Sequence, residues 1–262
     1  NRQFKRLDKE EQRIINKKEN KFFKSKIDPI MDTIQGKIPE NLKDILEKAF
    51  LKGFQLVFEK GEAFIEKTYQ KDRKELEHDL NNYAIDKEFS KKHIKRLDKQ
   101  ASNSNMVNTS FTILEGGVLG FFGIGLPDIP LFIVVIMKTI YEIALSYGYD
   151  YKNSKEKAFI LLIICGAMSG GEKQRKFNEQ IDCLGNEIDQ QINVEIDLKV
   201  GMTEASEVLS EAMLLGKFVQ GIPFLGVVGG AVNYSILKKL GKYASIKYKK
   251  RYLIKKVKEK EK

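Results

Sequence analysis

Three acidic residues lie in or beside apolar sequence, where a carboxylate could take part in chemistry: Glu115, Asp128 and Glu142. A carboxyl group in apolar surroundings has a raised pKa or needs a partner, and two such groups can act together as acid and base. Lys138 precedes Glu142 by four residues, so the two can pair on one helix face. Asp128 precedes an expected helix whose first turn carries Pro130, an arrangement that suits Asp128 as an N-cap. These carboxylates are candidates for a hydrolase-like site, with capping and ion pairing as the alternative.

Metal and nucleotide chemistry find no support in the sequence. Cys165 and Cys183 form no metal-binding spacing with each other or with a histidine. His78 and His93 stand in lysine- and glutamate-rich helical segments, which we interpret as solvated faces. The glycine-rich stretch 116–127 lacks the Gly-Lys-Ser/Thr ending of a phosphate-binding loop. We therefore expect no metal and no cofactor.

Helical periodicity runs through nearly the whole chain of 262 residues. It marks a long amphipathic helix over 42–65, a charged helical pair at roughly 72–82 and 86–100, and a further helix over 203–217. No stretch alternates apolar and polar residues in the manner of a strand. The sequence predicts an all-α fold, a helical bundle around glycine-rich apolar hairpins that basic amphipathic helices flank.

Changes in composition suggest how the chain divides. Residues 1–30 are predicted to form a basic amphipathic N-terminal helix, and residues 31–262 a single all-α domain. The polar stretch 101–110 is the best candidate for a boundary inside that domain.

Three uncharged, apolar runs cover 116–127, 158–171 and 218–237. Each is too short, or too interrupted by proline, glycine and polar residues, to be a convincing transmembrane helix. A buried hairpin, or one that enters a single leaflet, suits these lengths better. Each run carries one pair of glycines four positions apart, which lets helix backbones approach closely in a core or in a membrane. The pairs are Gly116 with Gly120, Gly166 with Gly170, and Gly226 with Gly230.

The net charge of +10 is concentrated at the two ends of the chain. Residues 1–26 carry +6, residues 238–262 carry +10, and the intervening residues carry −6. Basic ends favour an anionic partner, and no known nucleic-acid motif accompanies them, so anionic lipid is the preferred partner over nucleic acid. A solvated lysine-rich tail is the alternative. The candidate anion-binding residues are Lys238, Lys239, Lys242, Tyr243, Lys247, Lys249, Lys250, Arg251 and Tyr252.

Several short motifs together resemble the EcsC family. They comprise a Gly-Gly pair, a Leu-Pro-Asp-x-Pro turn, a helix that ends near a Tyr-Gly pair, and a late Pro-x-x-Gly block. The resemblance covers roughly 40–250 and is strongest over 111–171. The matching residues are Gly116, Gly117, Leu126, Pro127, Asp128, Pro130, Glu142, Tyr147, Gly148, Pro223, Gly226, Asn233 and Gly241.

This resemblance implies a bacterial protein that works at the cytoplasmic side of the membrane, because the family is named for a gene beside ABC-transporter genes. It supplies no catalytic residues. We expect a non-enzymatic peripheral membrane protein that binds anionic lipid, or the membrane or ATPase subunit of an ABC transporter. An enzyme that uses the three carboxylates and a pore-forming helical bundle remain the alternatives.

Overall fold

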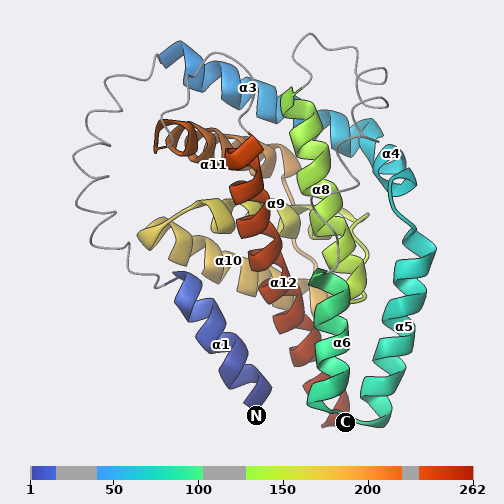
Figure 1. Ribbon diagram of the computed structural model, residues 1–262. Coiled ribbons are helices and arrows are strands. Elements are labelled where there is room, and N and C mark those ends of the chain that lie inside the picture. The colour runs from blue at the N-terminus through green and yellow to red at the C-terminus, as the bar shows by residue number, and fades with distance from the viewer. Residues whose placement is uncertain (1, 16–39, 103–127, 220–229, 262) are drawn as a thin grey trace.

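A computed structural model describes residues 2–15, 40–102, 128–219 and 230–261, which are helical and contain no strand (Figure 1). A five-residue π-helical segment, Val57–Gly61, joins α3 to α4. The prediction of an all-α fold is confirmed for these ranges. The helices are α1 (Arg2–Ile15), α3 (Glu40–Leu56), α4 (Glu62–Lys67), α5 (Lys71–Lys87), α6 (Lys91–Ser102), α8 (Asp128–Ser146), α9 (Ser154–Met168), α10 (Gly171–Asp189), α11 (Leu198–Val219) and α12 (Gly230–Lys260).

The predicted helices correspond to observed ones with shifted ends. The helix predicted over 42–65 is interrupted by the π-helical segment, which ends at Gly61. The charged pair is α5 and α6, and the helix predicted over 203–217 is α11, which is longer at both ends. Helix α6 continues through the first two residues of the predicted linker 101–110, and the rest of that linker lies outside the described residues. The boundary at residue 30 also lies outside them and stays a prediction.

Helix α8 is the most apolar helix and lies inside the structure. Residues 129–146 are long and apolar enough to cross a membrane by length and composition alone, yet the whole stretch is buried in the protein. Helices α3, α5, α6 and α12 pack around it. These neighbours already shield the apolar side chains of α8 from water, so the burial of these side chains does not depend on a bilayer.

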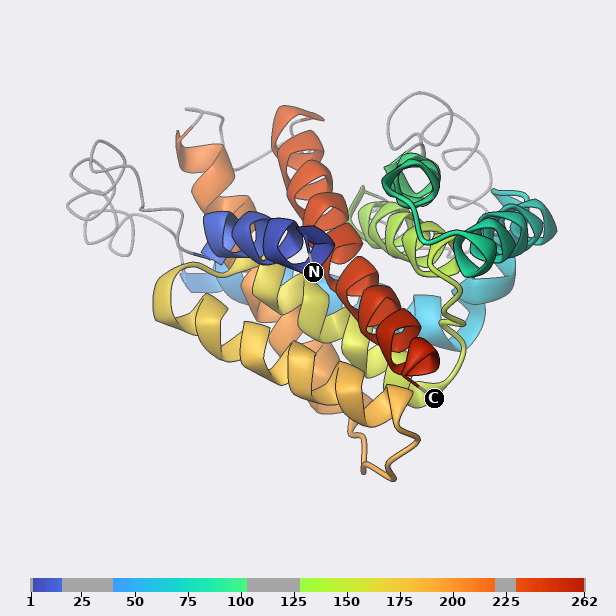
Figure 2. The same cartoon turned by 90° about the horizontal axis from the view of Figure 1, so that it is seen from below.

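The basic C-terminal helix lies in the middle of the bundle, which corrects the predicted arrangement. The sequence predicted that basic amphipathic helices flank the glycine-rich apolar hairpins of the bundle. Instead α12 packs against both α8 and α9 and runs between them (Figure 2). The reason is its apolar pattern: the buried residues of this 31-residue helix are spread around most of its circumference, so one contacting neighbour could not cover them. They include Ile236, Leu240, Ala244, Ile246, Tyr248 and Leu253.

Candidate anion-binding surface

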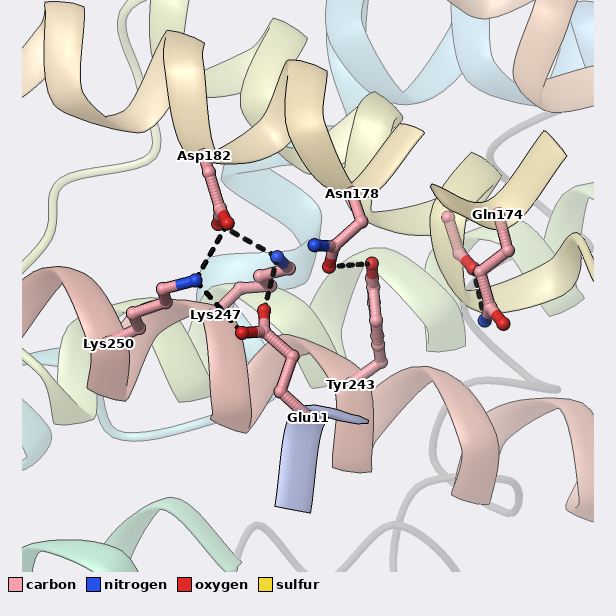
Figure 3. Close-up of polar contacts among 8 residues, drawn as sticks. Glu11, Gln174, Asn178, Asp182, Tyr243, Lys247 and Lys250 are labelled. Carbon is pink, nitrogen blue, oxygen red and sulfur yellow. Dashed lines mark hydrogen bonds and ion pairs between the residues drawn. The ribbon is translucent and has the colours of Figure 1, made fainter. Parts of the chain in front are cut away.

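Two lysines of α12 form a closed cluster with two carboxylates of the same chain (Figure 3). The ammonium of Lys247 is 2.8 Å from Asp182 on α10 and also donates to Glu11 on α1. The ammonium of Lys250 is 2.9 Å from Glu11 and 2.7 Å from Asp182. Burial disfavours the charged form of Lys250, but its hydrogen bonds to Asp182 and Glu11 outweigh that effect and raise its pKa. The cluster therefore fixes α1 and α10 to α12.

One turn further on, Arg251 is enclosed by acids and aromatic rings. Its guanidinium is 2.7 Å from Glu156 and 2.7 Å from Asp189. The rings of Tyr149 and Phe159 lie 4.1 and 4.4 Å from its central carbon, which adds a cation–π attraction. Burial raises the pKa of Glu156, although the guanidinium opposes that shift. Arg251 thus donates three hydrogen bonds to carboxylates of its own chain.

The other predicted residues in the second half of α12 are also engaged internally. Lys249 donates to Asp98 on α6 over 2.6 Å. Tyr243 and Tyr252 are buried, and their hydroxyls donate to Asn178 and Asn82, each over 2.9 Å. An external anion would have to compete with these partners.

The first half of α12 presents the remaining predicted cations to solvent. Lys238, Lys239 and Lys242 are exposed. The ammonium of Lys242 is 3.7 Å from Glu10 on α1, in a pair that is open to water on both sides. Such a pair is weak, so the ammonium of Lys242 remains accessible to an anionic partner.

A pentapeptide that occurs twice in the chain marks a second set of exposed cations. Lys-Arg-Leu-Asp-Lys stands at 5–9 in α1 and again at 95–99 in α6. Both helices pack on α12, and in both copies the leucine, Leu7 or Leu97, is buried in the hydrophobic core. The cations of each helix whose side chains are described point to solvent, and none of them has an ion-pair partner among the described residues. They are Lys5, Arg6, Lys9 and Arg13 of α1, and Lys91, Lys92, Lys95, Arg96 and Lys99 of α6.

The sequence reasoning counted the cations of α1 but missed those of α6. The net charge was counted over the whole segment 27–237, where the acidic residues outnumber the basic ones. The five exposed cations of α6 therefore did not stand out in that sum. The repeated pentapeptide was the available signal. The second copy indicates that the segment around 95–99 resembles the basic N-terminal segment.

Glu142, the one candidate catalytic carboxylate whose side chain is described, is held by two lysines. It is buried, with the ammonium of Lys74 at 2.9 Å and that of Lys138 at 3.7 Å. The predicted pair with Lys138 is therefore confirmed, and burial lowers the pKa of that lysine. Helix α8 begins at Asp128, whose side chain lies outside the description, as does all of Glu115. Among the described residues, no cluster of His, Cys, Asp or Glu is suited to a metal ion.

The predicted Tyr-Gly ending of α8 is built around a histidine. Gly148 has a φ of +79°, the left-handed conformation in which glycine commonly ends a helix. The ring of His78 on α5 lies against it, and Nδ1 of His78 is 3.0 Å from the carbonyl oxygen of Ser146. Because a carbonyl only accepts, Nδ1 carries the hydrogen. The interpretation of His78 as part of a solvated face was wrong, since this side chain closes the end of α8.

The remaining family-motif residues fall into two groups. Pro130 is buried in the first turn of α8, Tyr147 is buried and donates to Asp98, and Gly230 begins α12. Asn233 is buried, and its Oδ1 has no hydrogen-bond partner among the described residues. The other motif residues lie outside the described ranges: Gly116, Gly117, Gly120, Leu126, Pro127, Pro223 and Gly226.

Gly166, in the predicted glycine pair of the second apolar run, serves close packing inside the protein. A Cβ at this position would lie 2.9 Å from Ile181 on α10 and 3.0 Å from Tyr243 on α12. The pair's second member, Gly170, is the N-cap of α10. Gly166 therefore lets α9, α10 and α12 approach one another in the core, whereas Gly170 is exposed.

Comparison with known proteins places the chain among bacterial relatives. The model of the EcsC protein family matches residues 1–253, a range that includes α1. Protein EcsC of Bacillus subtilis (strain 168) is 26% identical over 216 residues, which cover 82% of this chain and 80% of that protein. The uncharacterized protein YdbA of the same strain is 26% identical over 168 residues, which cover 63% of this chain and 61% of YdbA. No solved structure matches. The chain belongs to the EcsC protein family.

Proposed function

We propose that the protein binds the anionic cytoplasmic face of a membrane as a peripheral protein, through the exposed cations of α1 and α6. The observation that carries this proposal is the pair of matching basic helices on α12. The nine cations of these helices whose side chains are described are exposed, and they have no ion-pair partner among the described residues. Each lysine or arginine close to an anionic surface contributes about 1 kcal/mol of attraction. Lys238, Lys239 and Lys242 of α12 add to the same charge.

The burial of the apolar faces suggests an electrostatic mode of attachment. Leu7, Ile94 and Leu97 are buried in the protein, so α1 and α6 have no free apolar face to insert among acyl chains. The apolar helix α8 is likewise covered. Attachment by surface charge alone weakens as salt screens it, and it needs acidic headgroups.

Co-sedimentation of the full chain with vesicles tests the proposal. We expect binding to vesicles of phosphatidylcholine with about one third phosphatidylglycerol, no binding to phosphatidylcholine alone, and release at about 0.5 M salt. Replacing either set of cations, the four of α1 or the five of α6, by glutamine is expected to weaken binding by at least about tenfold. Failure of the intact chain to bind anionic vesicles at low salt would refute the proposal.

A matched control uses exposed lysines at the far end of the molecule. Lys48, Lys52, Lys60 and Lys67 are exposed on α3, the π-helical segment and α4, at the end opposite to α1 (Figure 1). Their replacement by glutamine removes the same number of charges as the α1 variant, and binding is expected to change less than about twofold. An equal loss in both variants would show that net charge, and not this surface, governs attachment.

Dye-filled vesicles separate peripheral binding from the pore-forming alternative. We expect the dye to be retained at protein concentrations that saturate binding, because the apolar helix α8 stays covered by its neighbours. Dye release would favour the pore-forming alternative.

A further inference from the structure

Helix α5 exposes three large apolar side chains on one line. Leu76, Leu80 and Tyr83 have exposed fractions of 59%, 63% and 60%. Their spacings of four and three residues place them on one ridge of the helix, which we call the α5 ridge. The other exposed large apolar residues of the described chain stand singly: Ile45 on α3, Ile192 before α11, Val200 on α11 and Tyr234 on α12.

The α5 ridge has no role in holding α5 in place. Helix α5 packs against α6 and α8 through its opposite side, where Ile85 is fully buried and His78 closes the end of α8. Figures 1 and 2 both place α5 at the edge of the molecule, and Figure 1 shows no labelled helix outside it. Burying such a ridge against a partner would be favourable, because apolar side chains gain free energy when they leave water.

Acidic residues line one edge of the ridge. Asp72, Glu75, Asp79 and Asp86 follow one another at spacings of three, four and seven residues. Glu75 is 3.7 Å from Lys71, and Asp86 is 2.7 Å from Lys256. Asp72 and Asp79 are exposed, and neither has an ion pair within the described residues. This edge is negative on a protein of net charge +10.

The acidic edge distinguishes the α5 ridge from the basic surface of α1 and α6. An anionic bilayer would repel Asp72 and Asp79, so the ridge is unsuited to lipid. A second copy of the chain is also a poor occupant. Its exposed cations on α1 and α6 accompany leucines that are already buried, and those on α12 accompany a single exposed large apolar residue, Tyr234. The ammonium of Lys87 lies 4.6 Å from the centre of the Tyr83 ring. The negative charge that is open to a partner therefore lies at the end of the ridge with Asp72 and Asp79. The occupant that complements this end is apolar and basic.

We propose that the α5 ridge docks an amphipathic helix of a partner protein. Aliphatic residues of that helix cover Leu76, Leu80 and Tyr83, and its lysines or arginines pair with Asp72 and Asp79. Such docking uses side chains at helical spacing as anchors, and an aromatic residue like Tyr83 commonly supplies much of the affinity. Since α6 follows α5 directly in the chain, one helical hairpin then carries a lipid-facing helix and a protein-facing helix.

Two synthetic helical peptides of about 18 residues serve as probes. Both carry the same stripe of leucines at spacings of three and four, and their polar positions are all lysine in one and all glutamate in the other. Binding to the full chain is measured by fluorescence anisotropy without lipid. We expect saturable binding of the lysine peptide and at least about tenfold weaker binding of the glutamate peptide.

Variants of the exposed ridge locate the binding. The triple variant Leu76→Ser, Leu80→Ser, Tyr83→Ser is expected to weaken lysine-peptide binding by at least about tenfold. Asp72→Asn with Asp79→Asn is expected to weaken it about threefold or more and to reduce its salt dependence. The control variant Ile45→Ser, Val200→Ser removes exposed apolar residues elsewhere and is expected to leave binding unchanged. Thermal unfolding confirms that each variant stays folded.

Four outcomes would overturn the proposal. The first is the absence of lysine-peptide binding to the intact chain, and the second is equal binding by the triple variant. The third is self-association of the intact chain that the triple variant abolishes in sedimentation experiments, which would make a second copy the occupant. The fourth is loss of anionic-vesicle binding in the triple variant, which would assign the ridge to lipid. We expect the triple variant to lose peptide binding and to keep vesicle binding, so the failure of the docking proposal can be told apart from the failure of the proposed function.

Discussion

The guanidinium of Arg251, near the end of the chain, is 2.7 Å from the carboxylate of Glu156 in the first turn of α9. Both side chains are buried, with exposed fractions of 5% and 2%. The same guanidinium reaches Asp189, the last residue of α10, so one side chain joins three helices. The side chain of Asn153 accepts a hydrogen bond from the backbone N–H of Glu156, which fixes the start of α9 beside Arg251. The pair is therefore a structural centre of the bundle.

Replacement of Arg251 by methionine is expected to lower the free energy of unfolding by about 3–5 kcal/mol, because it leaves a buried carboxylate without its cation. Urea unfolding measures the loss. The double variant with Glu156→Gln is expected to be more stable than Arg251→Met alone, since no buried charge then remains at that position. A double variant as unstable as the sum of both single changes would contradict this account.

Glu11 is expected to hold α1 to the bundle, whereas its neighbour Glu10 is not. Glu11 is 3% exposed and bonds two lysines, while Glu10 forms one exposed pair with Lys242. Glu11→Gln is expected to cost about 2 kcal/mol and to speed amide hydrogen exchange in α1. Glu10→Gln serves as the matched control, with an expected change below about 0.5 kcal/mol. Equal effects of the two variants would show that the buried cluster does not anchor α1.

Replacing Gly148 and Gly171 by alanine allows the cost of backbone strain to be compared with the cost of a steric clash. Both have a positive φ, but a Cβ on Gly148 would lie 2.4 Å from Nε2 of His78, whereas a Cβ on Gly171 meets nothing within 4 Å. Gly171→Ala is expected to cost about 1 kcal/mol from backbone strain, and Gly148→Ala at least about 2 kcal/mol more. Thermal and urea unfolding measure both. A smaller cost for Gly148→Ala than for Gly171→Ala would show that His78 moves away freely.

The stability of the protein is expected to fall as pH drops below the ordinary pKa of histidine, in part through His78. Burial lowers the pKa of His78 below 6.5, although its hydrogen bond to the Ser146 carbonyl and the nearby Asp79 oppose that shift. Lys255 and Lys256 on α12 lower it further. The unfolded chain therefore binds this proton more tightly, so the stability that neutral His78 contributes above pH 6.5 is lost as pH falls through its folded pKa.

Urea unfolding midpoints of the intact chain and of His78→Gln, measured from about pH 7.5 to about pH 5, test this expectation. Glutamine keeps an N–H group for the Ser146 carbonyl and does not titrate. The stability advantage of the intact chain over the variant is expected to shrink as pH falls. Parallel curves for the two proteins would mean that His78 contributes no pH dependence.

Local patterns in the sequence were enough for the fold class and for several details. Helical spacing of apolar residues predicted the all-α fold, because that spacing depends only on the geometry of the helix itself. The three-residue spacing of Asn153 and Glu156 is typical of a helix N-cap, and a glycine such as Gly148 is typical of a left-handed helix end; the structure has both, at α9 and α8. The motif resemblance gave the EcsC family, which the family model confirms.

The position of α12 and the partners of its charges required the tertiary structure. Glu11 and Lys247 stand 236 residues apart, and nothing in the order of the residues indicates that they meet. Counting charge along the chain therefore treated the lysines of α12 as available, although several of them are paired with carboxylates from α1, α6 and α10. The charge count also gave no indication of the basic surface on α6. That surface depends on which cations face solvent, and a count along the chain does not show this.

By itself the sequence determined which segments are helices, where some of them begin and end, and to which family the chain belongs. Only the tertiary structure decided which of those helices cover one another. The physical reason is that helix formation depends on neighbours along the chain, whereas burial and ion pairing depend on distances in space. The apolar residues of α8 suit a bilayer and a protein core equally well, and the helices packed around them place this stretch in a core.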